Sequence, residues 1–168
     1  MNLFDTEIPF LNASVFEAFG KIQNRDSFAD LSEEQQIKLG KLNELLEQFI
    51  AADAYVIVNP MWNFSIPLIL KAYIDVVLQV GKTIHYTENG PAGLLKNKKA
   101  LHIQASGGIY TNGDTVANEF GHPYLKTVMA FIGVVDVNFI PVEGIALGQT
   151  DISEILSLAK AKEIASVF

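Results

Sequence analysis

The chain has 168 residues, of which 49% are hydrophobic and 18% are charged, and it carries a net charge of −7 and no cysteine. This length suits one domain with a full core, spanning residues 1–168, and the composition is unlike that of disordered chains. The acidic balance, with Arg25 as the sole arginine, argues against nucleic-acid binding, and the lack of cysteine excludes thiol catalysis and cysteine-based metal sites. With no signal-peptide pattern and no apolar stretch near the roughly 18 residues of a spanning helix, we expect a cytoplasmic protein without membrane contact.

The first part of the chain predicts two helices and a strand. Val15–Ile22 suggests a short helix. Ser32 and Gln35 form a capping box ahead of apolar residues at helical spacing, so a second helix is predicted to end near Ala52. Tyr55–Val58 is a continuous, largely β-branched run, which is typical of a strand covered on both faces.

The next segment, Ile66–Val80, predicts a helix with Pro67 in its first turn. Its circumference is apolar apart from a stripe formed by Lys71, Asp75 and Gln79. We therefore expect the sheet to cover one side and a second copy of the chain to cover the other. Lys71 and Asp75, four positions apart, are interpreted as a surface ion pair.

The second half continues the alternation of helices and strands. We predict, in order, a loop at Thr83–Pro91, a strand at Ala100–Gln104, a helix from about Thr115 or Asn118 to Ile132, a strand at Val134–Ile140, and a tail helix from a capping box at Asp151 almost to Phe168. This order predicts an α/β fold with a parallel sheet and right-handed crossovers.

Two turns leave successive strand ends, at Pro60–Phe64 and at Ala105–Tyr110. They should lie side by side at the sheet edge where ligands bind in open α/β folds. The first turn offers apolar surface and one amide, and the second offers closely approachable backbone: Met61, Trp62, Phe64 and Asn63, then Gly107 and Gly108. A flat heteroaromatic with one polar edge, such as isoalloxazine, suits this pair. The alternative is an ordinary pair of strand-to-helix loops.

Other reactive side chains give little. His85, His102 and His122 are spread over a predicted loop, strand and helix start, and no pair has ligand spacing, so we do not expect a metal site. His102 is interpreted as a hydrogen-bonded core residue. No serine lies in a Gly-x-Ser-x-Gly elbow, which disfavours a serine hydrolase.

Six segments between Ala51 and about Gly148 carry a resemblance to a known family. They are Asn59–Pro67, Leu70–Asp75, Gly81–Leu94, Lys98–Ala100, Gly107–Tyr110 and Phe131–Gly133. In these segments the chain resembles the FMN-dependent NADH azoreductase and NADH:quinone oxidoreductase family. The resemblance implies a flavodoxin-like three-layer sandwich with a parallel sheet.

The resemblance also implies a site, residue by residue. It assigns FMN contacts to both turns and the walls of the substrate pocket to aromatic side chains, partly across a dimer interface: Met61, Trp62, Asn63, Phe64, Ala105, Ser106, Gly107 and Gly108 for the cofactor, and Tyr86, Tyr110 and Phe131 for the pocket. It further implies a homodimer in which NADH or NADPH reduces FMN and a quinone or azo compound then takes the reducing equivalents. Both substrates bind in turn at one flavin site, and no side chain is assigned a catalytic role.

The chain departs from the family pattern in two places. Ser106 stands where the family often has arginine, which affects contacts at the edge of the flavin or substrate. The family's first strand, phosphate-binding loop and first helix would align ahead of Met1, so we expect an N-terminally truncated form of the fold. The alternative function is a catalytically impaired, dimerising fragment with weak or no FMN binding.

Overall fold

The structure is a computed structural model that describes residues 1–148 and 150–166. These residues form two compact units. The first unit comprises Met1–Ala52 and Leu68–Gln79, and the second comprises Asp53–Pro67 and Val80–Phe168. Every residue expected from the sequence at the two strand-end turns belongs to the second unit.

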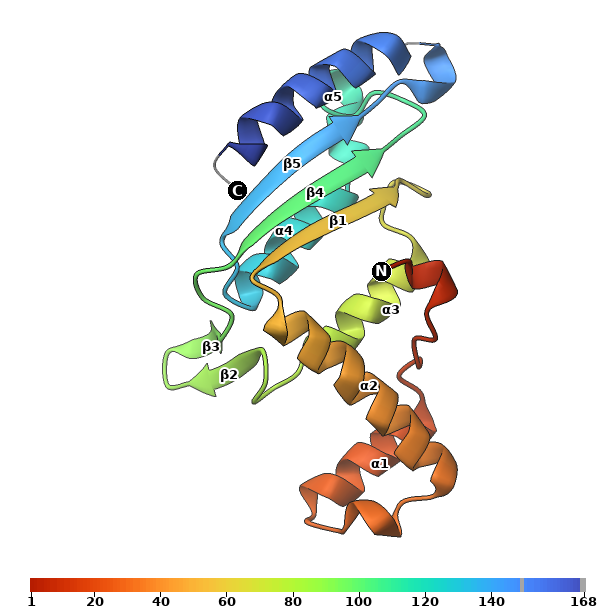
Figure 1. Cartoon of the computed structure of the whole chain (residues 1–168), viewed down its shortest axis with the longest axis vertical. Coiled ribbons are helices and arrows are strands. Elements are labelled where there is room, and N and C mark those ends of the chain that lie inside the picture. The colour runs from red at the N-terminus through yellow and green to blue at the C-terminus, as the bar shows by residue number, and fades with distance from the viewer. Residues whose placement is uncertain (149, 167–168) are drawn as a thin grey trace. The chain divides into compact units, whose positions relative to one another are not determined.

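The first unit is helical (Figure 1). Its elements are the 3-10 turns η1 (Leu3–Asp5) and η2 (Phe28–Asp30) and the helices α1 (Ala13–Gln23), α2 (Glu33–Ala51) and α3 (Leu68–Val77). The predicted capping box is confirmed, because the Ser32 side chain accepts from the N–H of Gln35 and the Gln35 side chain accepts from the N–H of Ser32. One face of α2 is buried, through Leu42, Leu45, Leu46 and Phe49.

Helix α3 packs on α2 through aromatic rings. The ring of Tyr73 lies edge-on to that of Phe49, with centroids 6.1 Å apart, and burial raises the pKa of Tyr73 to about 12. The predicted ion pair is confirmed, since Lys71 Nζ lies 2.6 Å from Asp75 Oδ1. The helix is shorter than the predicted range of Ile66–Val80. It begins at Leu68, directly after Pro67, and ends at Val77.

The second unit is built on a three-stranded parallel sheet (Figure 1). Its order is β1 (Ala54–Pro60), β4 (Lys99–Ala105), β5 (Asp136–Val142), with helix α4 (Gly121–Phe131) on one face and helix α5 (Thr150–Ala165) on the other. Both strand pairs are parallel, with Pro60 opposite Ala105 and Ala105 opposite Val142 at their carboxyl ends. The predicted α/β architecture is therefore confirmed.

Strand β1 corrects one prediction. Val56 and Val58 are 58% and 68% exposed, so this strand is not covered on both faces. The register places them beside Leu101 and Ile103 of β4, which are half-buried, whereas α5 packs against β5. A continuous apolar run indicates a strand but does not indicate whether a helix lies over it.

The predicted loop at Thr83–Pro91 is also corrected. It contains most of an antiparallel hairpin, β2 (Ile84–Thr87) and β3 (Gly90–Gly93), in which the hydroxyl of Thr87 donates to the carbonyl of Gly90 at 2.8 Å. The hairpin lies against the end of α4, because a Cβ on Gly93 would lie 2.1 Å from the backbone nitrogen of Gly133. The N–H of Leu95 also donates to the carbonyl of Ile132 at 2.8 Å.

The helix predicted from Thr115 or Asn118 is divided. A 3-10 turn, η3 (Gly113–Asn118), comes first, and α4 begins at Gly121. The carboxylate of Glu119 caps α4, accepting from the N–H groups of Gly121 and His122 at 2.8 and 2.9 Å. The tail helix α5 is confirmed, but the predicted capping side chain of Asp151 and the end at Phe168 lie outside the described residues.

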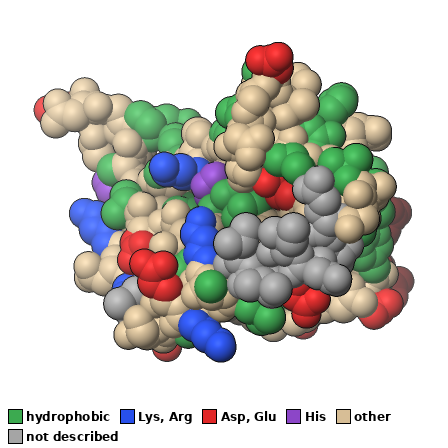
Figure 2. Space-filling view, turned by 90° about the horizontal axis from the view of Figure 1, so that it is seen from above, with side chains coloured by type: hydrophobic (Ala, Val, Ile, Leu, Met, Phe, Trp, Pro, Cys, Tyr) green, Lys and Arg blue, Asp and Glu red, His purple; other side chains and the backbone are tan. Residues whose placement is uncertain are grey.

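Hydrophobic side chains also reach the surface of the second unit. Figure 2 shows hydrophobic side chains exposed between acidic and basic ones. The large ones that are at least 50% exposed in this unit are Val56, Val58, Trp62, Val80, Tyr86, Phe120, Val135, Leu147 and Leu158.

Candidate functional site

The two turns expected from the sequence lie side by side at the carboxyl end of the sheet. Strands β1 and β4 are neighbours and end in register at Pro60 and Ala105. The N–H of Met61 then donates to the carbonyl of Ala105 at 2.7 Å, so the first residue beyond β1 is fastened to the end of β4. The structure thereby brings together Met61–Phe64 and Ala105–Gly108.

The first turn is a strained two-residue loop. Trp62 and Ser65 exchange backbone hydrogen bonds of 2.9 and 3.0 Å, and Asn63 and Phe64 between them have φ values of 47° and 69°. Two successive positive φ angles are those of a type I′ turn, which asparagine tolerates and a bulky residue normally avoids. The carbonyl of Phe64 accepts from the N–H of Phe120 at 2.9 Å, which helps to hold the turn.

This turn presents aromatic surface. Trp62 is 52% exposed and Phe64 is 47% exposed, and the ring of Tyr110 lies edge-on to that of Phe64 with centroids 6.2 Å apart. The N–H groups of Asn63 and Phe64 donate to no other residue within the described part of the chain. The turn thus combines apolar ring faces with free backbone donors.

The second turn is tied down through its carbonyl groups. The carbonyls of Ser106, Gly107 and Gly108 accept from the N–H groups of Ile145, Ala146 and Gly144, respectively, at 3.0 to 3.3 Å. The Ser106 side chain is buried and its hydroxyl donates to the carbonyl of Gly108 at 2.9 Å.

The N–H groups of this second turn remain available. Those of Gly107 and Gly108 donate to none of the residues that the structure describes. A Cβ on Gly108 would lie 3.1 Å from the ring of Tyr110, and one on Gly107 would lie 3.3 Å from the Cβ of Ala146. The turn therefore leaves free donors in a space that larger side chains would crowd.

Glu143 is a site residue that sequence reasoning missed. Its carboxylate accepts from the N–H of Tyr110 at 2.6 Å and from the hydroxyl of Thr111. It thus fixes the segment that carries Tyr110 to the end of β5. It lies directly after β5, which runs two residues beyond the predicted end at Ile140, and charged residues at a strand end face the ligand-binding edge of such sheets.

Two histidines that seemed unrelated in the sequence are neighbours. His102 Nδ1 lies 3.2 Å from His122 Nδ1, and His102 Nε2 lies 3.0 Å from Asn59 Oδ1. The strand and helix start predicted for these two residues are confirmed, but their sequence spacing did not show that the rings meet. The interpretation of His102 as a hydrogen-bonded core residue is confirmed by its bond to Asn59 and its 1% exposure. Burial, and then the charge of His122, lowers the pKa of His102 to about 3.

His122 is half-buried at the start of α4. Burial lowers its pKa, as do the charges of Lys126 and Lys160, while the charge of Glu119 opposes them. Its ring also stacks on that of Phe139, with centroids 4.0 Å apart. Both imidazoles are therefore biased toward the neutral form. Among the described residues, no group of three potential ligands is placed to hold a metal ion.

The three expected pocket residues are not all brought together within one chain. Tyr110 lies at the first turn, against Phe64. Tyr86 is on the hairpin and Phe131 ends α4, and both lie at the amino end of the sheet, opposite the turns (Figure 1). Their assignment to one pocket with Tyr110 stays a prediction that needs a second copy of the chain.

Comparison with known proteins identifies the family. A family described as having a flavodoxin-like fold matches residues 1–165. An FMN-dependent NADH:quinone oxidoreductase of Halalkalibacterium halodurans is 51% identical over all of this chain and 81% of its own length. The chain belongs to the FMN-dependent NADH:quinone oxidoreductase family. The resemblance to this family and to the flavodoxin-like fold is thereby confirmed.

Solved structures agree with this family assignment. An FMN-dependent NADH-azoreductase from Bacillus anthracis, in complex with FMN, superposes with a TM-score of 0.92 at 38% identity, over 99% of this chain and 78% of that one. The azoreductase AzrA superposes with a TM-score of 0.89 at 30% identity, over 100% of this chain and 81% of that one. The family is one of enzymes.

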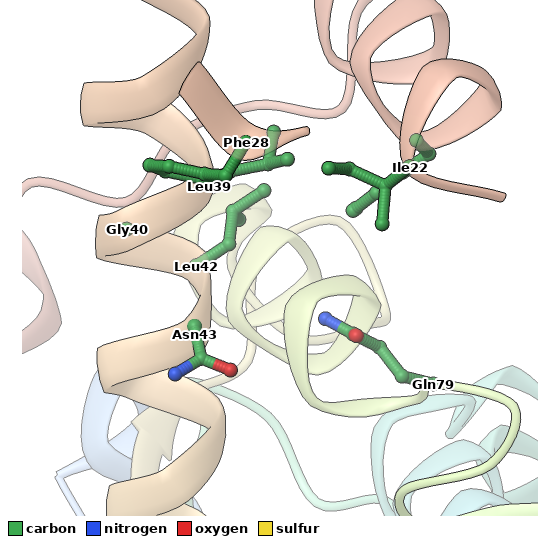
Figure 3. Close-up of a pocket in the computed structure, with 8 residues that line it drawn as sticks. Ile22, Phe28, Leu39, Gly40, Leu42, Asn43 and Gln79 are labelled. Carbon is green, nitrogen blue, oxygen red and sulfur yellow. The ribbon is translucent and has the colours of Figure 1, made fainter. Parts of the chain in front are cut away.

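A pocket lies in the first unit, away from the two turns in the sequence (Figure 3). The pocket has a volume of about 460 Å³. Leu42 points into it from α2 and Ile22 faces it from α1, while the amide of Gln79 points toward Asn43. Its lining is mainly apolar, from Phe19, Ile22, Phe28, Leu39, Gly40, Leu42, Asn43 and Gln79. None of these residues was expected to bind substrate or cofactor.

In the part of the chain that the structure describes, no helix is long and apolar enough to cross a bilayer.

Proposed function

We propose that this chain is an FMN-dependent oxidoreductase that passes reducing equivalents from NADH or NADPH to quinones and azo compounds. The observation that carries the proposal is the pair of adjoining turns, Met61–Phe64 and Ala105–Gly108, which offer free N–H groups beside exposed aromatic rings. The names of the relatives supply the cofactor, donor and acceptor classes.

The residues present suit a flat ring with one polar edge. Met61, Trp62 and Phe64 provide the apolar surface on which a ring system can pack. The free N–H groups of Gly107 and Gly108 can donate to its polar edge, and their lack of side chains keeps that approach open. We therefore assign the FMN contacts to the eight residues that the sequence suggested, with Ser106 acting mainly on the shape of its own turn.

In the proposed mechanism the protein positions and polarises the reactants. When bound, FMN supplies hydride acceptance and release, with negative charge developing at the polar edge of its ring. Fixed backbone donors at the second turn, already oriented by their bonded carbonyls, stabilise that charge without reorganising. Donor and acceptor would bind in turn at this one site, beside Tyr110. No side chain forms a covalent bond to substrate.

We also propose that the working form is a cytoplasmic homodimer. Tyr86 and Phe131 lie opposite the turns within one chain, so they can wall the pocket only from a partner copy. Exposed apolar side chains such as Leu68 (71% exposed) and Val135 (77% exposed) favour such an association. The cytoplasm is where a nicotinamide donor is available. Analytical ultracentrifugation measures the oligomeric state directly.

The decisive experiment is reconstitution. The purified chain is incubated with FMN and desalted, and its flavin absorbance and its oxidation of NADH with menadione or methyl red are measured. We expect a yellow protein, and parallel double-reciprocal plots, which report that donor and acceptor react in two separate, alternating steps. A chain that stays colourless and inactive after reconstitution refutes the proposal.

A matched pair of variants localises the site. Trp62→Ala removes an exposed ring from the first turn, and we expect it to weaken FMN binding about tenfold, in line with the roughly 1.5 kcal/mol of an aromatic packing contact. Phe28→Ala removes an exposed ring of similar accessibility (47%) from the first unit and should leave FMN binding unchanged. Equal effects of the two substitutions would place the cofactor elsewhere.

A second candidate is a dimerising fragment that binds FMN weakly or not at all. It is favoured by β1, which pairs only with β4 among the described strands and exposes Val56 and Val58. An open edge of this kind readily pairs with another chain. A dimer that forms without FMN and takes none up would support this candidate over the enzyme.

A further inference from the structure

A chain of hydrogen bonds leads from the start of α4 to the end of β1. His122 Nδ1 lies 3.2 Å from His102 Nδ1, and His102 Nε2 lies 3.0 Å from Asn59 Oδ1. The amide nitrogen of Asn59 in turn donates to the carbonyl of Pro60 at 2.9 Å. Asn59 is 6% exposed and His102 is 1% exposed, so water does not compete for these bonds.

The bond from Asn59 to Pro60 determines which atom donates and which accepts in each of the other bonds. Because the NH₂ group of Asn59 donates to the carbonyl of Pro60, its oxygen faces His102 and can only accept. His102 must then carry its proton on Nε2, which leaves Nδ1 as an acceptor in the neutral ring. His122 must therefore carry a proton on Nδ1. Each donor in this row of bonds has one acceptor, and with both rings neutral no second arrangement satisfies all three bonds.

Packing holds the rings in this arrangement. The rings of His102 and Phe139 stack with centroids 5.2 Å apart, and those of His122 and Phe139 with centroids 4.0 Å apart. Phe139 sits on β5 opposite His102 of β4. The two imidazoles are thus fixed by the sheet on one side and by α4 on the other.

This series of hydrogen bonds ends where the candidate flavin-binding turn, Met61–Phe64, begins. Pro60 is the last residue of β1 and pairs with Ala105, and Met61 follows with its N–H on the carbonyl of Ala105. Pro60 has no N–H of its own to fasten it to a neighbouring strand. The side chain of Asn59 therefore adds a hydrogen bond to the backbone at the point where the first turn leaves the sheet.

We propose that Asn59, His102 and His122 are positioning residues, which set the direction in which Met61–Phe64 leaves the sheet toward the flavin. This inference rests on the proposed function. This series of hydrogen bonds does not serve as a proton path. It ends in the amide of Asn59 and the carbonyl of Pro60, neither of which takes up or releases a proton near neutral pH. Its role is to orient the backbone.

Two variants of nearly equal size separate positioning from packing. In His102→Gln the side-chain NH₂ reaches the place of Nε2 and keeps the bond to Asn59. In His102→Asn the shorter amide lies near the place of Nδ1 and keeps only the bond to His122. Both are neutral and both remove the ring that stacks on Phe139, so a role in packing alone predicts similar losses.

The first measurement needs no cofactor. In the ¹⁵N spectrum of the wild-type imidazoles we expect protonated nitrogens at His102 Nε2 and His122 Nδ1, with the other two unprotonated. The amide resonances of Met61 to Ser65 should shift more in His102→Asn than in His102→Gln. The opposite tautomers, or equal amide shifts in the two variants, would overturn the inference whether or not the chain binds FMN.

The second measurement uses FMN. His102→Asn loses the bond to Asn59, which holds the backbone of the first turn, whereas His102→Gln keeps it. One buried hydrogen bond corresponds to about a tenfold change, so we expect FMN binding, measured by flavin fluorescence, to be about tenfold weaker in His102→Asn. The flavin midpoint potential should also depart further from the wild-type value in His102→Asn than in His102→Gln. Equal affinities and potentials at equal thermal stability would refute positioning. A wild-type chain that binds no FMN refutes the proposed function and leaves the decision to the spectra.

Discussion

The buried imidazole of His102 makes the stability of the second unit depend on pH in a way that can be calculated. Its pKa is lowered from 6.5 to about 3, first by burial and then by the charge of His122. Between these pH values the unfolded chain binds a proton at this residue and the folded chain does not. The free energy of unfolding therefore rises with pH up to about 6.5 and is constant above it.

The size of the effect follows from the same two values. Each pH unit below 6.5 removes about 1.4 kcal/mol, so lowering the pH from 7 to 5 should reduce the free energy of unfolding by about 2 kcal/mol. His122, whose pKa is also lowered by burial, adds a smaller loss of the same sign. Carboxylates contribute little in this window, because they titrate mainly below it.

Urea unfolding followed by tryptophan fluorescence tests this result. Trp62 is the only tryptophan and belongs to the same unit as His102, so its signal reports the relevant unit. His102→Gln has no titrating group at this position and should lose about 2 kcal/mol less than the wild type between pH 7 and pH 5. His102→Asn should behave in the same way. Identical pH dependence in wild type and both variants would refute the reasoning.

Three further substitutions have expected outcomes measurable by urea unfolding or hydrogen exchange. Gly93→Ala should destabilise the chain by roughly 3 kcal/mol or more, because the new Cβ would overlap the backbone of Gly133; near-wild-type stability would contradict this packing. Gly40→Ala should stabilise α2 by about 1 kcal/mol, since a Cβ there meets nothing within 4 Å; a loss of stability would contradict it. Glu143→Gln should speed amide exchange at Tyr110 about tenfold by weakening a charge-assisted hydrogen bond, and unchanged exchange would contradict it.

The sequence predicted the two turns because each follows a short apolar run at a strand end. The parallel order of the elements then placed both strand ends at one edge, so Trp62 and Gly107 could be assigned to one site before their positions were known. The family resemblance depended on the same residues. What could not be read was the exposure of Val56 and Val58, because an apolar run does not report which neighbours cover it.

The histidine pair illustrates a second limit. His102 and His122 are separated by 20 positions and meet only because α4 begins at the carboxyl end of β4 and runs back along the sheet. Neither a shared helical face nor an alternation within one strand links them, so no periodicity could have joined them. The hairpin at 84–93 was not predicted from the sequence for a different reason. The glycines and the proline of β3 are residues that strands normally avoid, so no strand pattern was visible.

Phe64 shows how strain and function meet in one residue. Its φ of 69° is costly for a bulky side chain, by about 1 kcal/mol or more, and glycine would adopt it freely. Its ring compensates in part through the edge contact with Tyr110, yet it remains 47% exposed, so packing within the chain does not account for its presence. If the exposed ring serves the flavin or substrate, Phe64→Gly should keep or raise thermal stability while lowering NADH:menadione turnover about tenfold. A variant that loses stability but keeps turnover would show that the ring serves the fold alone.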